Sequence, residues 1–206
     1  MAQNQKMRVR DIRHLIRMNF TEDDYWITLT YKREERPPDI KSAKHEAELF
    51  RKRVKRLYDQ AGVPMKWIQK TEIGKKGGVH HHLIMNRVDG LDKVLAEKWK
   101  KGRAHFQLLY KDGDFVKLAE YVGKQEGKVY DYTRSRNLLR PKRKKETMNG
   151  RTFGRTPKKK GYELEKGTLH EGVNPMGWPY RRYAMRKLWL KSTLKRKRKT
   201  RAPDTA

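Results

Sequence analysis

The sequence predicts an α+β fold with an antiparallel sheet, followed by a basic C-terminal region. Short segments rich in β-branched and aromatic residues recur between residues 25 and 110, as is typical of strands. The segments between them repeat apolar residues every three or four positions, as is typical of helices that bury one face. Toward the C-terminus this pattern weakens, and Lys and Arg accumulate instead.

A strand and a long helix are expected first. Residues 25–31 (YWITLTY) are β-branched and aromatic, and residues 36–39 (RPPD) end this strand because proline lacks the N–H that a sheet needs. The apolar residues of segment 40–58 are spaced by three or four positions, so they form one stripe of a helix. This helix should begin after Asp39 and end at Gly62.

A hairpin, a short helix and a fourth strand are expected next. Residues 65–73 and 79–86 have strand composition, and the glycine-rich segment 74–78 (GKKGG) between them predicts a hairpin. The apolar pattern then predicts a short helix over residues 91–99 and a strand over residues 104–110.

A last helix should be capped by Asp112 or Asp114. Its apolar residues are Phe115, Leu118, Ala119 and Val122. The order of elements is therefore β-α-β-β-α-β followed by a helix, the split arrangement of ferredoxin-like domains, with an antiparallel sheet and helices on one face. Since this topology hosts many functions, the fold alone does not identify one.

The chain divides into three predicted regions. Residues 1–126 form the folded domain, with its core at about 20–126. Residues 127–191 form a basic linker and a small C-terminal element, and residues 192–206 a disordered basic tail. The composition changes accordingly, since residues 126–206 contain 25 basic and 7 acidic residues.

Composition limits the possible functions. The 206 residues carry a net charge of +29, which indicates a polyanionic partner and favours nucleic acid over a membrane surface. The absence of cysteine excludes disulfides, zinc-thiolate sites and cysteine nucleophiles. No apolar segment reaches the length of a signal peptide or a membrane span, so we expect a soluble protein of the cytoplasm.

Three consecutive histidines lie in the predicted strand GGVHHHLIM. Side chains alternate along a strand, so His80 and His82 share one face and His81 lies on the other. Glu72, on the hairpin partner, can pair beside them. Two imidazoles and a carboxylate suit a divalent ion, Mn²⁺ or Mg²⁺, and zinc would also fit. Alternatively, the two histidines are solvated polar residues and Glu72 balances nearby lysines.

The last predicted helix contains AEYVGKQ, which places Tyr121 and Lys124 three residues apart on one helical face. A tyrosine hydroxyl can be a covalent nucleophile, and a lysine one turn away can offset the charge of a phosphate under attack. Alternatively, Tyr121 only packs against the sheet beside Leu118 and Val122.

Taken together, these motifs resemble the HUH endonucleases, in particular the single-tyrosine replication initiators of phages and plasmids that replicate by a rolling circle. The resemblance covers roughly residues 20–126. It rests on WITLTY, Glu72, the histidine strand and EYVGK. This family normally has a hydrophobic residue between the two histidines. His81 departs from that pattern, so it must find a hydrogen bond or stay neutral on the buried face.

The resemblance implies that residues 1–126 are an HUH-type nuclease domain that nicks single-stranded or melted origin DNA. Glu72, His80 and His82 would hold the divalent metal, and Tyr121 would form a 5′-phosphotyrosine link, assisted by Lys124. Reversal by another 3′-hydroxyl would rejoin strands. No G-x-x-x-x-G-K-[ST] motif occurs, so unwinding would need a host helicase beside the host polymerase.

Two alternatives remain at this stage. The same chemistry serves plasmid mobilisation relaxases and single-tyrosine transposases. A non-enzymatic ferredoxin-like protein could instead bind single-stranded DNA or RNA through aromatic side chains and basic loops. In either case, Arg33, Lys75 and Lys76 are candidate phosphate contacts.

Overall fold

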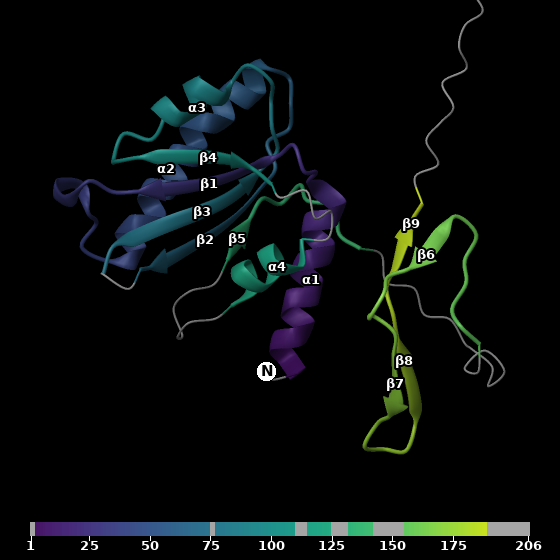
Figure 1. Ribbon diagram of the computed structural model, residues 1–206. Coiled ribbons are helices and arrows are strands. Elements are labelled where there is room, and N and C mark those ends of the chain that lie inside the picture. Colours follow the sequence, from purple (N-terminus) through teal and green to yellow (C-terminus); the bar gives the residue numbers. More distant parts are fainter. Residues whose placement is uncertain (1–2, 75–76, 110–114, 125–131, 142–154, 189–206) are drawn as a thin grey trace, which may run out of the picture. The chain divides into compact units, whose positions relative to one another are not determined.

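The computed structural model describes residues 3–74, 77–109, 115–124, 132–141 and 155–188. Two compact units make up the chain, residues 1–143 and residues 144–206, and each is described by itself (Figure 1). The first unit exceeds the domain predicted over residues 1–126, because a short strand after residue 131 joins its sheet.

A five-stranded antiparallel sheet forms the centre of the first unit, in the order β4-β1-β3-β2-β5. Its strands are β1 (Tyr25–Thr30), β2 (Trp67–Ile73), β3 (Val79–Met85), β4 (Ala104–Leu108) and β5 (Thr133–Arg134). Its helices are α1 (Gln3–Asn19), α2 (Ile40–Gln60), α3 (Asp92–Glu97) and α4 (Val116–Gly123), with a 3-10 turn, η1 (Arg33–Glu35). The predicted α+β fold with its split β-α-β-β-α-β order is therefore confirmed.

Helix α2 begins and ends where the sequence indicates. The carboxylate of Asp39 accepts a hydrogen bond of 2.7 Å from the backbone N–H of Ser42, which satisfies one of the free donors of the first turn. At the other end Gly62 has a φ of 68°, a conformation that glycine adopts without a Cβ clash.

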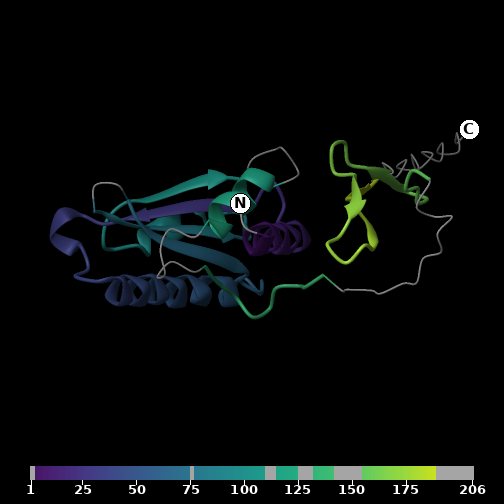
Figure 2. The same ribbon diagram turned by 90° about the horizontal axis from the view of Figure 1, so that it is seen from below.

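Apolar side chains pack on both faces of the sheet. Ile27, Leu29 and Leu83 lie in one buried cluster with residues of α2 and α3. Ile68 and Ile84 lie in a second buried cluster with residues of α1 and α4. Figure 2 shows α2 running along one face. The expectation that helices cover one face is correct for α2 and α3 and wrong for α1 and α4.

The sequence analysis assigned no helix to residues 3–19. Helix α1 buries Ile12, Leu15 and Ile16, which are spaced by three and one as on a helical stripe. Its partner is α4, and Gly123 makes the close approach possible: a Cβ there would lie 3.1 Å from Val9 Cγ2 and 3.2 Å from Ile12 Cδ1. The two helices thus stabilise one another on the sheet.

The start of α4 differs from the prediction. Its N-cap residue is Phe115, with a left-handed φ of 53° and no side-chain cap, whereas Asp112 and Asp114 lie outside the described residues. The Phe115 ring is buried in the cluster of α1 and α4. Its packing offsets the cost of a conformation that residues with a Cβ rarely adopt.

The second unit contains two small antiparallel ribbons among its described residues. Strand β6 (Tyr162–Leu164) pairs with β9 (Met185–Lys187), and β7 (His170–Val173) pairs with β8 (Pro179–Arg182). In the β7–β8 turn the Asn174 side chain accepts hydrogen bonds from the backbone of Met176 and Trp178. The expected tail over residues 192–206 lies outside the described residues.

No helix in the described residues is both long and apolar enough to cross a bilayer.

His81 is buried on the α2 face of the sheet, as the strand alternation predicts. Its side chain is 0% exposed. Its Nδ1 lies 2.8 Å from the Thr71 hydroxyl and its Nε2 lies 2.8 Å from the Tyr31 hydroxyl. Burial, together with the nearby Arg51, lowers the pKa of His81 to about 3. The imidazole is therefore neutral at physiological pH, with both nitrogens hydrogen-bonded.

We expect the variant His81→Leu to lose about 1–3 kcal/mol of stability at pH 7.5, because two inward hydroxyls lose a partner. Its pH dependence should also be flatter. Unfolded His81 takes up a proton below about pH 6.5, whereas folded His81 does so only near pH 3. Between these values the wild type should lose up to about 1.4 kcal/mol per pH unit more than the variant. Urea unfolding at pH 7.5, 6 and 5 measures both effects, and parallel pH profiles would contradict this assignment.

Candidate active site

The strand register gathers polar side chains on the sheet face opposite to His81. Glu72 of β2 pairs directly with His80 of β3, and Lys70 pairs with His82. On the other side of β3, Thr28 of β1 pairs with His82. Since directly paired residues project from the same face, one carboxylate, one lysine and two imidazoles share this surface. The predicted hairpin pairing of Glu72 with the histidine strand is confirmed.

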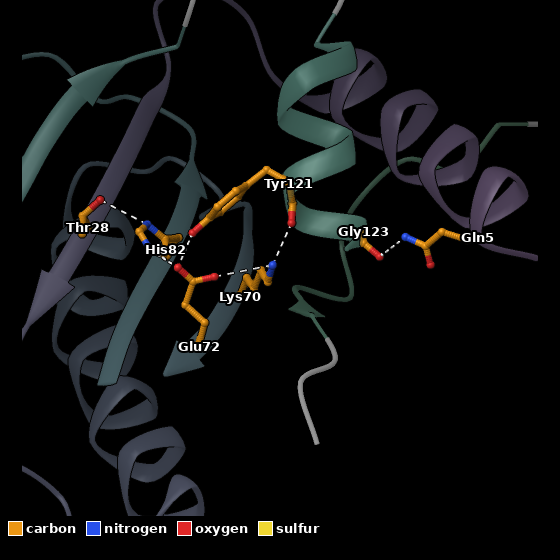
Figure 3. A network of polar contacts seen from close by, with 7 residues as sticks. All are labelled: Gln5, Thr28, Lys70, Glu72, His82, Tyr121 and Gly123. Carbon is orange, nitrogen blue, oxygen red and sulfur yellow. Dashed lines mark hydrogen bonds and ion pairs between the residues drawn. The ribbon is translucent and has the colours of Figure 1, made fainter. Parts of the chain in front are cut away.

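The carboxylate of Glu72 connects the sheet to helix α4 (Figure 3). Its Oε1 lies 3.2 Å from His82 Nε2 and accepts a 2.6 Å hydrogen bond from the Tyr121 hydroxyl. Tyr121 comes from α4, which lies across this face of the sheet. Three side chains that are far apart in the sequence thus meet at one oxygen atom.

The ring of His82 is held on both sides. Its Nδ1 lies 3.2 Å from the Thr28 hydroxyl, and its ring stacks on Trp26 with centroids 5.3 Å apart and planes 15° apart. Tyr121 contacts both rings edge-on, at 5.6 Å from Trp26 and 5.3 Å from His82. The packing role considered for Tyr121 is therefore present, together with the polar contact of its hydroxyl.

The electrostatics of the site keep Glu72 ionised. The hydrogen bond from His82 is the largest cause that lowers the pKa of Glu72, to about 2, and the hydrogen bond from Tyr121 and the charge of Lys70 act in the same direction. A carboxylate with this pKa is a weak base at neutral pH. It suits the roles of hydrogen-bond acceptor and cation ligand better than that of general base.

Lys70 is a residue of this site that the sequence analysis missed. Its side chain is only 3% exposed. The ammonium donates a 2.8 Å hydrogen bond to the backbone carbonyl of Tyr121, lies 3.5 Å from Glu72 Oε2, and lies 4.5 Å from the centre of the Tyr121 ring. Its position two residues before Glu72 in the same strand was the available signal, because that spacing places both side chains on one face.

Lys124 does not lie on the helix with Tyr121. Helix α4 ends at Gly123, and Lys124 is its C-cap residue, with an extended backbone and an exposed side chain. The end of α4 is held by a 2.8 Å hydrogen bond from the Gln5 side chain to the Gly123 carbonyl. The expectation of one helical face shared by Tyr121 and Lys124 is therefore wrong, and Lys70 is the cation in contact with Tyr121.

His80 lies beside His82, with ring centroids 6.4 Å apart and planes 23° apart. A Cβ at Gly74 or Gly78 would lie 3.4 Å from His80 Nε2, so these glycines leave space around its ring. Within the described part of the chain, no three His, Asp or Glu side chains are grouped closely enough to hold a metal ion. The metal role of Glu72, His80 and His82 therefore stays a prediction.

The other candidate residues lie elsewhere. Arg33 is exposed in η1, whereas Lys75, Lys76 and Tyr130 lie outside the described residues. Tyr132 accepts a 2.8 Å hydrogen bond from Arg134 and packs against the cluster of α1 and α4. Their proposed contacts with DNA stay predictions.

The fold and this gathering of charged and aromatic residues on one sheet face agree with a comparison with protein families. The model of a family of replication-associated proteins, described as ORF2 and gene 2 proteins, matches residues 24–126. This segment is half of the chain and includes strands β1 to β4 and helix α4. The chain therefore belongs to this family of replication-associated proteins. Neither the curated proteins nor the solved structures gave a match.

Lys70→Met should lower the free energy of unfolding by about 1–3 kcal/mol, because the Tyr121 carbonyl loses its donor and Glu72 loses a cation. The pKa of Glu72 should rise in this variant, which carboxyl NMR can follow. Lys124→Met is the matched control. Since its side chain is exposed, it should change stability by less than about 0.5 kcal/mol. Equal effects of the two variants would contradict the role assigned to Lys70.

Proposed function

We propose that this protein is an HUH-type endonuclease that starts rolling-circle replication. It would nick single-stranded or melted origin DNA and remain attached through a 5′-phosphotyrosine on Tyr121. The observation that carries the proposal is the contact of the Tyr121 hydroxyl with Glu72, next to His82. A tyrosine that only packed against the sheet would not need its hydroxyl at an ionised carboxylate between two histidines and a buried lysine.

A divalent ion, Mn²⁺ or Mg²⁺, is the proposed cofactor. One carboxylate and two imidazoles on the same sheet face are a suitable donor set, and Glu72 is held in the charged form that a cation ligand requires. Glu72, His80 and His82 would hold the ion, which when bound supplies positive charge that polarises a phosphate. The glycines beside His80 leave its ring space to turn toward Glu72.

Tyr121 would supply the attacking atom. Its hydroxyl oxygen forms a bond to phosphorus, and the bond from phosphorus to the 3′ oxygen of the preceding nucleotide breaks. The proton lost by the phenol is balanced by the proton that the departing 3′ oxygen takes up. The products are a 5′-phosphotyrosine and a free 3′-hydroxyl, which can prime synthesis. Attack by another 3′-hydroxyl reverses the step and rejoins a strand.

The surrounding residues would orient this reaction. Lys70 fixes the backbone of Tyr121 and keeps a positive charge within 3.5 Å of Glu72. Trp26 and His82 hold the Tyr121 ring from two sides, so few side-chain orientations remain to be lost before attack. Lys124, next to the end of α4, is proposed to contact the attacked phosphate.

Replication is favoured over mobilisation and transposition by the family to which the chain belongs. The non-enzymatic binding module is a weaker proposal, because it requires no contact between Glu72, His82 and Tyr121. It would also use exposed aromatic side chains at the middle of the sheet, whereas Trp26 is stacked on His82. The absence of a nucleotide-binding loop motif makes a host helicase and polymerase the proposed partners.

Tyr121→Phe should abolish both nicking and the covalent adduct, because only the attacking atom is removed and the ring still packs. The assay is incubation with Mn²⁺ and labelled single-stranded origin DNA, followed by a denaturing gel. Tyr132→Phe is the matched control and should still form the adduct. Peptide mapping identifies the tyrosine, and an adduct on a residue other than Tyr121 would refute the assignment.

His80→Ala and His82→Ala should each lower the rise in melting temperature that Mn²⁺ causes, because an ion that binds only the folded state stabilises it. They should also remove cleavage. DNA affinity should change less than about threefold, since phosphate neutralisation elsewhere supplies most of it. An Mn²⁺ response that is the same in both variants and in the wild type would exclude these histidines as ligands.

A further inference from the structure

A polar cavity lies between helix α2 and strand β2, on the sheet face opposite to Glu72. Its volume is about 360 Å³. Lys41, Lys44 and Arg51 of α2 line it, together with Gln69 and Thr71 of β2. Because Gln69 and Thr71 alternate with Lys70 and Glu72, the cavity and the candidate active site are separated by the sheet itself.

The charge of this cavity is unbalanced. Arg51 stacks on the Trp67 ring at 4.1 Å and donates a hydrogen bond to the Gln69 side chain. Burial lowers the pKa of Arg51 to about 10, which shows that its positive charge is poorly compensated. In the part of the chain that the structure describes, no carboxylate lies within ion-pair distance of Arg51. Glu48, the only acidic residue of the lining there, pairs with Lys52 at 2.8 Å.

The floor of the cavity is fixed. Gln69 and Thr71 are both buried, and the Gln69 amide donates a 3.3 Å hydrogen bond to the Thr71 hydroxyl. The same hydroxyl lies 2.8 Å from Nδ1 of the buried His81. The donors of the cavity are thus held by the core, while its lysines lie at the surface. A rigid guanidinium with mobile ammonium groups around it is a suitable receptor for a phosphate.

We propose that this cavity binds a backbone phosphate of a nucleic-acid strand, at a site separate from the one where Tyr121 lies. The positive charge continues beyond the cavity, since α2 carries seven Lys and Arg residues against three acidic residues. A strand bound here extends along α2, which a single small anion does not. The inference rests on the proposed function only in taking DNA as the source of the phosphate.

The test compares Arg51→Met and Lys44→Met with Lys55→Met. Methionine keeps the aliphatic contacts of each side chain and removes one charge. Lys55 is the matched control, since it lies on the same helix outside the cavity and bonds to Asp59. The affinity of a fluorescent single-stranded oligonucleotide is measured over a series of salt concentrations. Thermal melting shows that each variant is folded, and Lys44→Met keeps the test valid if Arg51→Met is not.

We expect Arg51→Met and Lys44→Met each to reduce the slope of log affinity against log salt by about 0.7, the value for one lost phosphate contact with a single strand. Affinity at low salt should fall about three- to tenfold. Arg51→Lys should restore part of the slope, because charge returns without the planar fork. Lys55→Met should leave the slope unchanged. Equal slopes for all variants and the wild type would overturn the proposal.

Two further measurements separate the possible sources of the phosphate. Inorganic phosphate and a nucleoside triphosphate are tested for their ability to compete with the oligonucleotide and to raise the melting temperature. Millimolar competition by both, lost in Arg51→Met, supports a phosphate site that DNA occupies. A specific rise with the triphosphate and no change of the DNA salt slope would assign the cavity to a free nucleotide and refute the strand proposal.

The adduct assay distinguishes this inference from the proposed function. At saturating DNA, Arg51→Met should still form the Tyr121 adduct, because the cavity lies on the other face of the sheet. A wild-type protein that forms no adduct but shows the salt-slope difference would refute the nicking mechanism and leave the cavity proposal intact. The reverse result would refute the cavity proposal alone.

Discussion

The two hydrogen bonds of His81 are the constraint on which the polar side of the sheet depends. A strand has only two faces, so one residue fixed inward determines the direction of its neighbours. His81 is fixed by Thr71 on β2 and by Tyr31 just after β1. Slipping β3 by one residue would break both bonds and bury His80 and His82 instead. The middle histidine, which departs from the pattern of HUH proteins, thus secures the register with polar contacts.

On the opposite face a single carboxylate organises the polar contacts. Glu72 takes part in contacts from β3, from α4 and from its own strand through His82, Tyr121 and Lys70. Each partner either donates a hydrogen bond to it or provides positive charge, so the carboxylate is stable in its charged form while largely shielded from water. The same contacts hold α4 against the sheet, which links the position of the tyrosine to the ionisation of the glutamate.

Strand alternation and hairpin pairing act over short distances along the chain, and these parts of the fold could be predicted. Segment 25–31, helix 40–58, the hairpin and the shared face of Glu72, His80 and His82 all follow from local spacing. Helix α1 and the end of α4 could not be predicted in this way. Their stability comes from packing against one another at Gly123, a contact between segments more than a hundred residues apart. Lys124 was misplaced for the same reason.

The shortness of α4 has a consequence for partly folded chains. Eight residues are too few for a stable isolated helix in water. Its helical form depends on the buried Phe115 ring at one end and on the Lys70 and Gln5 hydrogen bonds at the other. The hairpin with its histidines can form locally, but Tyr121 comes into position only after α1 has docked. If Tyr121 attacks DNA as proposed, a chain that is still folding, or has lost α1, carries a disarmed site and cannot break a strand prematurely.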